Sequence, residues 1–283
     1  MKLTKIASVH PRCQDGAFWN GLCFRFDCGA HGFVYNIEEL CSANGALVAP
    51  MARFMLSGIE KIRPHSNSVV FGAEYFADGD EFPLLYSNVY NNYEFEEEQR
   101  KGMCLVYRLQ RDGDTFSATP VQAVQVGFSH DDCWTAENEE RPFGNFVIDT
   151  KTRRLYAFVM RIDHTRCFVF SLPSVTEGEM DESLGVKKVL LTKDDVIDWF
   201  DYEYQEFMQG ACFHDGKIYT TEGYSIRSDH EPTIRVIDVV AKKQVLLERF
   251  AKYGAIEEPE LIDFVDGVCY YSDAKGDVYT ICF

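Results

Sequence analysis

The chain has 283 residues, of which 46% are hydrophobic and 14% aromatic, a composition typical of a packed globular protein and not of a disordered one. Its net charge of −17 argues against nucleic acid or an anionic membrane surface as a partner, because both would repel the chain. No apolar run approaches the about 18 residues that a membrane-spanning helix requires.

The N-terminal sequence MKLTKIASVHPRC lacks the apolar segment of a signal peptide, and none of the 10 cysteines forms a C-x-x-C pair. Cys23 and Cys212 are examples of cysteines in apolar, strand-like runs, where a free thiol behaves as a small hydrophobic residue. We therefore expect a soluble, cytoplasmic protein with reduced cysteines. Secretion is the alternative if the N-terminus is a processed end.

In chain order, the strand-like run KLTKIASV (2–9) is followed by hairpin signals, each flanked by residues suited to strands. Three hairpins carry an Asn-Gly or Asp-Gly turn, whose two residues tolerate positive φ: Asn20-Gly21, Asp215-Gly216 and Asp266-Gly267. Two further hairpins, with longer turns, are predicted at 67–88 and 144–160. A third strand follows each hairpin, at 32–37, 104–109, 167–172, 233–239 and 277–283.

A fourth strand-like run follows the first four of these units, at 46–56, 121–128, 186–191 and 243–250. The fifth unit stops after three strands, and the run at 2–9 supplies the missing one. Between the third and fourth units, TKDDVIDWF (192–200) predicts a short helix with Thr192 as its N-cap.

This pattern predicts a single all-β domain, a β-propeller of five blades with four antiparallel strands each, closed by the N-terminal strand pairing in the last blade. We place the blades at about 13–60, 64–128, 141–200, 206–252 and 257–283 plus 1–9. A β-sandwich or two stacked all-β domains is the alternative architecture, and six blades the alternative count.

Aligned on their turns, the innermost strands share a polar residue at their start. These residues are Gln14, Asn67, Asn145 (or Gly144), Gln209 and Glu260. Small residues such as Gly210-Ala211 follow them, as expected for strands crowded around an axis. Amides both donate and accept hydrogen bonds, so such a ring at the channel mouth is suited to a polar ligand; its alternative role is to bind water and neighbouring backbone.

The loops predicted on that face of the propeller strengthen the interpretation. They carry every histidine except His214: His10, His31, His65, His130, His164 and His230. From this face we predict His10, His65, Glu258 and Tyr224 as further ligand-binding residues.

Other chemistries find weaker support. A glycoside hydrolase needs two carboxyl groups about 5–9.5 Å apart, for which Asp15 and Glu260 are the candidates. However, HPRCQD (10–15) lacks the His-Asp-Pro motif of arabinan- and xylan-cleaving propellers. His10, His65 and Glu260, or the cluster HDDC (130–133), could ligate a metal, but no spacing is specific and we predict neither metal nor cofactor. The acidic run 94–100 is interpreted as a solvated loop tip, with a basic partner as the alternative.

HSNSVVFG (65–72) with FPLLYSN (82–88), MQGACFHDGKIY (208–219) and EPELIDFVDGVCYY (258–271) resemble a group of uncharacterised bacterial β-propellers. The resemblance covers most of the chain but rests on weakly specific motifs. It implies a five-bladed propeller with a pocket at the channel mouth near His65, Asn67, Gln209 and Glu260. We therefore expect a small polar ligand, in the first place a carbohydrate. The alternatives are a glycan-cleaving hydrolase or lyase and a protein-interaction scaffold, and the oligomeric state is left open.

Overall fold

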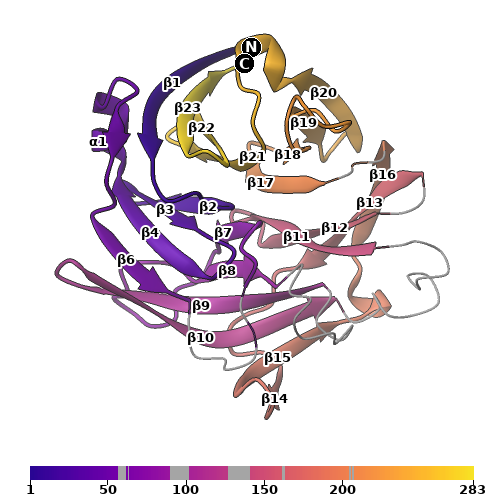
Figure 1. The fold of residues 1–283 in the computed structure, drawn as a ribbon. Coiled ribbons are helices and arrows are strands. Elements are labelled where there is room, and N and C mark those ends of the chain that lie inside the picture. The colour runs from indigo at the N-terminus through magenta and orange to yellow at the C-terminus, as the bar shows by residue number, and fades with distance from the viewer. Residues whose placement is uncertain are drawn as a thin grey trace.

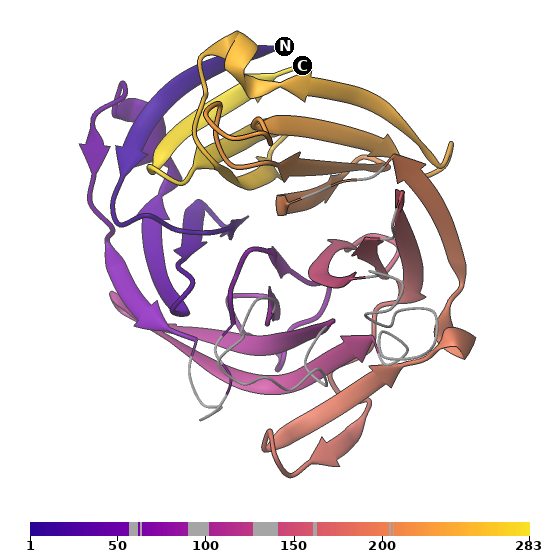
Figure 2. The same cartoon turned by 45° about the vertical axis from the view of Figure 1, so that its right-hand side comes forward.

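The computed structural model describes residues 1–56, 62, 64–89, 102–126, 141–160, 163–203, 205 and 207–283, with the backbone alone for 141–144 and 160. His130, the cluster at 130–133 and the acidic run at 94–100 lie outside these residues. Within the described part, the strands form five sheets arranged around a common axis, as Figures 1 and 2 show. The predicted five-bladed all-β propeller is confirmed, in agreement with the fold that the resemblance implied.

In each blade the first-named strand lies nearest the axis and the last-named strand lies at the rim. Blade 1 consists of β2 (Gly16–Trp19), β3 (Leu22–Phe26), β4 (His31–Asn36) and β6 (Ala52–Met55). Blade 2 consists of β7 (Val69–Phe71), β8 (Leu85–Asn88), β9 (Met103–Asp112) and β10 (Thr115–Val126). Blade 3 consists of β11 (Arg141–Asp149), β12 (Arg154–Met160), β13 (His164–Ser171) and β16 (Asp198–Glu203). Blade 4 consists of β17 (Met208–His214), β18 (Lys217–Glu222), β19 (Thr233–Asp238) and β20 (Lys243–Arg249). Blade 5 consists of β21 (Pro259–Val265), β22 (Val268–Asp273), β23 (Asp277–Cys282) and β1 (Lys2–Val9).

The three tight hairpins adopt the backbone that their residue pairs predicted. Asn20 and Gly21 have φ of 49° and 76°, and Asp215 and Gly216 have 47° and 73°. Positive φ at both turn positions matches the right-handed twist of the flanking strands. These turns therefore set the register of the inner two strands in blades 1 and 4, and a third Asp-Gly turn does so in blade 5.

The N-terminal strand closes the ring as predicted. β1 pairs antiparallel with β23, from Lys2 opposite Cys282 to Ser8 opposite Asp277. Asp277 accepts a hydrogen bond from the Ser8 hydroxyl at 2.7 Å and forms an ion pair with Lys5 at 2.7 Å. The two ends of the described chain consequently lie beside each other in both ribbon views (Figures 1 and 2).

The connection between the third and fourth strands of blade 3 departs from the prediction. The fourth strand of blade 3 is β16, and the run that we expected in that place is β15 (Val186–Leu191). β15 pairs in parallel with β10 of blade 2 and carries β14 (Glu179–Asp181) on its other side. The predicted helix at 192–200 is reduced to a 3-10 turn, Lys193–Asp195, after which the chain enters β16.

The remaining elements lie at the periphery. The short helix α1 (Ile37–Ser42) was not predicted; its N-cap Asn36 accepts hydrogen bonds from two backbone N–H groups of the first turn. β5 (Leu47–Val48) adds to β1 in parallel, and the 3-10 helix Phe250–Tyr253 follows β20. In the described residues, no helix is long and apolar enough to cross a membrane.

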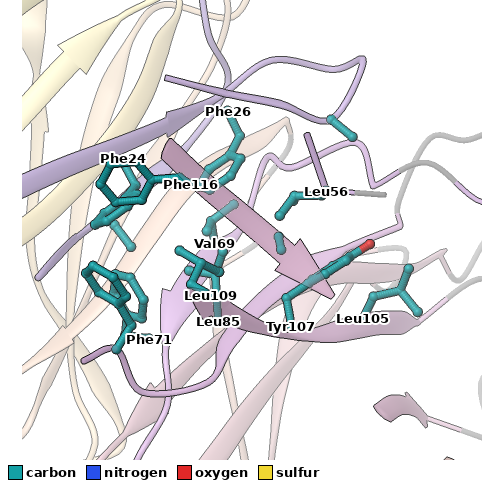
Figure 3. Packing of buried hydrophobic residues seen from close by; sticks show 14 of the residues in the cluster. Phe24, Phe26, Leu56, Val69, Phe71, Leu85, Leu105, Tyr107, Leu109 and Phe116 are labelled. Atoms are coloured by element: carbon teal, nitrogen blue, oxygen red, sulfur yellow. The ribbon is translucent and has the colours of Figure 1, made fainter. Parts of the chain in front are cut away.

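The hydrophobic core lies between neighbouring blades. Figure 3 shows the largest cluster, where blade 1 packs on blade 2 around Phe24. The Phe24 ring is fully buried and meets four other phenylalanine rings edge-on at 5.5 to 6.4 Å. Burying each such side chain stabilises the fold by about 1.5–3 kcal/mol. The inter-blade packing therefore holds the inner strands, and the polar residues at their ends, in fixed positions.

Candidate functional site

Polar side chains from all five blades meet where the innermost strands begin. They are Gln14 and Asp15 before β2, Asn67 before β7, Asn145 in β11, Gln209 in β17 and Glu260 in β21. In β11, β17 and β21 the polar residue lies where strand pairing changes register. Such bulges turn a side chain away from the regular pleat. The backbone irregularity therefore explains how these residues reach their neighbours in other blades.

Two hydrogen bonds join blade 5 to the blades beside it. Gln14 donates from Nε2 to Oε1 of Glu260 at 3.2 Å, and Gln209 donates from Nε2 to Oε1 of Glu258 at 2.8 Å. Gln14 and Glu258 are half-buried, whereas Glu260 is only 1% exposed. Glu260 therefore lies beneath an outer layer of polar side chains.

Asn145 joins blades 2, 3 and 4. Its Nδ2 donates to the carbonyl of Gln209 at 2.9 Å and lies 3.4 Å from the carbonyls of Asn67 and Met208. The Asn67 side chain accepts a hydrogen bond from Nδ2 of Asn88 at 2.6 Å. Asn145 and Gln209 thus link their blades to others through their side-chain amides, whereas Asn67 contributes its backbone carbonyl between blades and uses its side chain within blade 2.

Asp15 closes the network between blades 1 and 2. Its Oδ2 accepts a hydrogen bond from the backbone N–H of Val69 at 2.8 Å, and its own N–H donates to the carbonyl of Ser66 at 3.0 Å. Its Oδ1 lies 3.1 Å from the point where a Cβ on Gly210 of blade 4 would stand. Asp15 therefore reaches from blade 1 toward the opposite side of the ring. We name Gln14, Asp15, Asn67, Asn145, Gln209, Glu258 and Glu260 the polar ring.

The small residues around the polar ring are required by close backbone contact. A Cβ on Gly210 would stand 2.0 Å from the carbonyl oxygen of Glu260. A Cβ on Gly16 would stand 2.1 Å from the carbonyl oxygen of Phe24 and 2.8 Å from Cδ1 of Leu261. Neither position has room for a side chain, so glycine at these positions lets the inner strands approach each other near the axis.

Burial dominates the electrostatics of the site. Desolvation raises the pKa of both Asp15 and Glu260 well above the ordinary range of carboxyl groups. Nearby carboxylates add to this, because Glu258 and Asp15 both raise the pKa of Glu260. Burial also raises the pKa of Glu258, which the hydrogen bond from Gln209 partly opposes. Burial therefore favours the protonated, neutral form of the deep carboxyl groups.

Arg25, which the sequence pattern did not single out, is buried beside the polar ring. It lies on β3 opposite Gly16 and is 1% exposed. Its charge lowers the pKa of Asp15, of Glu260 and of Asp273 at the end of β22, so the guanidinium lies near all three carboxyl groups. An arginine in the second strand of a hairpin gives no signal of burial in the sequence, and only the packing of blade 5 against blade 1 encloses it.

Several polar atoms of the site are buried without a hydrogen-bond partner in the described part of the chain. They are Oδ1 of Asp15, Oε2 of Glu260, Oδ1 of Asn145, Oδ1 of Asn88 and the three guanidinium nitrogens of Arg25. Native proteins satisfy about 90% or more of such groups, so a cluster of exceptions requires an explanation. These atoms give the site both hydrogen-bond donors and acceptors for a further molecule.

The three remaining predicted site residues lie outside the polar ring. His65 precedes Ser66 and is half-buried, and burial lowers its pKa. Tyr224 packs against Phe207 with ring centroids 4.4 Å apart, at the end of β17 that carries Gln209. His10 is exposed and lines a separate hollow of about 690 Å³ with Phe33 and Arg53 of blade 1. The structure therefore brings the amides and carboxyls together but separates His10 from them.

Within the residues that the structure describes, no group of three or more His, Cys, Asp or Glu side chains is arranged to hold a metal ion. His10 and Glu260, two members of the metal-ligand set considered from the sequence, take part in different features. The polar ring is instead composed of amides and carboxyl groups beside one guanidinium, which are suited to hydrogen bonding of organic groups.

Comparison with known proteins adds no activity. No protein-family model matches the chain, and no curated protein matches it in sequence. Similar solved structures include the computationally designed Ika8 protein, at 8% identity over 99% of each chain with a TM-score of 0.37. BamB from Moraxella catarrhalis has 9% identity over 98% of this chain and 75% of that chain, with a TM-score of 0.34. The Dos1 propeller has 9% identity over 95% and 59%, with a TM-score of 0.36. The fold assignment therefore rests on the strand pairing described above.

Proposed function

We propose that the protein binds a small polar ligand, a carbohydrate in the first place, through the polar ring at the mouth of its channel. The observation that carries the proposal is the cluster of buried, unpartnered polar atoms where the inner strands of the blades meet. Each such atom destabilises the unliganded protein by about 1–3 kcal/mol. A ligand that pairs with them recovers this free energy on binding.

The chemistry of the unpartnered atoms favours hydroxyl groups. The amide oxygens of Asn88 and Asn145 accept hydrogen bonds, whereas the Arg25 guanidinium only donates them. A hydroxyl donates and accepts at once, so several hydroxyls on one small molecule can serve both kinds of partner. Tyr224, which is 39% exposed on the Gln209 side of blade 4, adds an aromatic surface for the apolar face of a sugar ring.

A glycan-cleaving reaction at Asp15 and Glu260 is the second candidate. The raised pKa of Glu260 and its unpartnered Oε2 suit a general acid. The second carboxyl group of a hydrolase must be ionised to act as base or nucleophile. Burial raises the pKa of Asp15 as well, which disfavours that state. We therefore place ligand binding before hydrolysis.

A thermal-shift screen with neutral and acidic monosaccharides and disaccharides tests the proposal. We expect at least one sugar to raise the Tm of the wild-type protein, and Gln209→Ala and Glu260→Ala to abolish that rise. Gln110→Ala is the matched control, because Gln110 is an exposed amide on β9. If the ligand-induced rise in Tm survived both site substitutions, the polar ring would not be the ligand-binding site. Its side chains would then only bind water and neighbouring backbone.

A further inference from the structure

We propose that the ligand of the polar ring carries a carboxylate, which pairs with the guanidinium of Arg25, so that the site selects acidic sugars over neutral ones. This inference rests on the proposed function, since it names the chemical class of the molecule that the ring binds. Its evidence is the buried position of Arg25 and the lack of a described hydrogen-bond partner for its guanidinium, together with the raised pKa of the neighbouring carboxyl groups.

The position of Arg25 follows from the alternation of β3. Leu22, Phe24 and Phe26 belong to the core shared with blade 2, whereas Cys23 belongs to the cluster that contains Leu261 of blade 5. Successive side chains of a strand point to opposite faces, so Arg25 shares the face of Cys23 and points between blades 1 and 5. The same inter-blade space holds Glu260, whose pKa responds to the Arg25 charge.

The guanidinium of Arg25 has no hydrogen-bond partner among the described residues, although it is buried. Its Nε, Nη1 and Nη2 are all without one, and the residue is 1% exposed. Arg235 is the internal comparison: it is 3% exposed, but its Nη2 donates to Oε1 of Glu222 at 3.0 Å. A buried arginine with a structural role is therefore paired in this fold, and Arg25 lacks the equivalent partner.

None of the described carboxyl groups forms a hydrogen bond with the Arg25 guanidinium. Burial raises the pKa of both Asp15 and Glu260, which favours their neutral, protonated form, although the Arg25 charge partly opposes this. Asp273, whose pKa is raised to about 6, is ionised at pH 7, but its Oδ1 accepts hydrogen bonds from the backbone N–H groups of Lys275 and Asp277. The donors of Arg25 are thus left for an incoming anion.

A carboxylate suits these surroundings better than a more highly charged anion. The guanidinium presents its N–H groups in a planar fork that matches the two oxygens of a carboxylate. A phosphate monoester carries about −1.5 to −2 charges at neutral pH and would be repelled more strongly by Asp273. The hydroxyls of the same ligand would meet Glu260 and the amides of the polar ring. This combination of a single carboxylate and several hydroxyls describes a uronic acid.

Matched ligands test the inference with the full chain at pH 7. Calorimetric titrations compare D-galacturonate with D-galactose and with the methyl ester of galacturonate, and D-glucuronate with D-glucose. We expect wild-type protein to bind at least one uronate at least tenfold more tightly than its neutral counterpart and its ester. Arg25→Gln should abolish that preference, whereas Arg227→Gln, which removes the same charge from an exposed loop, should preserve it. Arg25→Lys keeps the charge but loses the fork, and should retain only part of the preference.

The outcomes separate the two proposals. If neutral sugars bind as tightly as uronates, or if Arg25→Gln keeps the preference, the inference is overturned and the proposed function stands. If no sugar binds, the carbohydrate proposal falls, and acetate against acetamide then decides the role of Arg25. If acetate raises the Tm of the wild type but not that of Arg25→Gln, a carboxylate-binding site at Arg25 is supported. If acetate and acetamide change the Tm equally, the carboxylate site is refuted. The wild-type comparisons need no variant, so equal binding of uronates and neutral sugars overturns the inference even if Arg25→Gln fails to fold, and Arg25→Lys then tests the role of the guanidinium.

Discussion

Single residues with unusual surroundings define the site, and Gly210 is the clearest example. Its Cα faces the backbone carbonyl of Glu260, so two inner strands approach each other without an intervening side chain. The bulge at Gln209 and Gly210 both turns the amide out of the sheet and brings the two backbones together. The position of the polar ring therefore depends on the lack of a Cβ at this residue.

We predict that Gly210→Ala lowers the free energy of unfolding by about 2 kcal/mol or more, since the added methyl group would stand 2.0 Å from the Glu260 carbonyl oxygen. Urea denaturation measures the change. Gly29→Ala is the control, because its Cβ would meet only the side-chain tips of His31 and Asp27, at 3.1 and 3.2 Å. Equal stability of the two variants would contradict the close approach of blades 4 and 5.

The sequence pattern predicted that the amides and Glu260 lie where the inner strands begin, but it did not predict that Arg25 is buried beside them. Gln14, Gln209 and Glu260 stand at one fixed distance before a turn glycine, so a local pattern exposes them. Arg25 is enclosed by residues more than two hundred positions away along the chain, and no local pattern records that contact. The position of His10, which lines a hollow with Phe33 and Arg53 of blade 1, likewise has no counterpart in the local sequence pattern.

The tight hairpins were predictable from the sequence, whereas the fourth strand of blade 3 was not. An Asn-Gly or Asp-Gly turn specifies its own pairing, because both strands lie next to it in the sequence. β15 and β16 are both strand-like, and either could have completed blade 3. The choice depends on β10, which offers β15 a parallel partner from Gln122 to Val126. Such long-range pairing is decided by the assembled blades and not by the residues of the strand.

The closing strand β1 has both buried and exposed positions, so it can be tested by a pair of substitutions. Ala7 is fully buried in the cluster between blades 1 and 5, whereas Thr4 on the same strand is exposed. We expect Ala7→Asp to destabilise the protein by at least ~3 kcal/mol, because it buries an unpaired carboxyl group. Thr4→Asp should have little effect. Hydrogen exchange measures the result: in Ala7→Asp the amides of β1 and β23 should lose protection before those of blades 2 and 3, and uniform loss would contradict a separable closure.

At the scale of the whole molecule, the buried carboxyl groups set the pH dependence of stability. Burial raises the pKa of Glu222 to about 7 and that of Asp273 to about 6, and it also raises the pKa of Asp15 and of Glu260 well above the ordinary range. In the unfolded chain all four titrate near about 4. Between these values the folded protein binds more protons than the unfolded chain, so its stability falls as the pH rises.

We therefore predict that the free energy of unfolding is greatest near about pH 5 and falls by at least ~2 kcal/mol by pH 8, since each unit of pKa shift corresponds to about 1.4 kcal/mol. Below about pH 4 stability falls again, because carboxyl groups with a lowered pKa become protonated. Asp181 is an example, since the Lys188 ammonium lowers its pKa to about 2. Urea denaturation at constant ionic strength from pH 4 to pH 8 measures the profile. Glu222→Gln should reduce the loss, and stability that rises from pH 5 to pH 8 would refute the assignment.

The pairing of β1 with β23 also has a consequence for the time course of folding. Ser8 and Asp277 are 269 residues apart in the sequence, so the contact that completes blade 5 is among the least local in the molecule. Closing so long a loop is entropically unfavourable, and folds dominated by such contacts form slowly. During synthesis, β1 leaves the ribosome long before its partner exists and has an unpaired strand edge throughout that interval. This strand carries polar and positively charged side chains at Lys2, Thr4 and Lys5. These side chains would oppose aggregation of the unpaired strand until β23 has been synthesised.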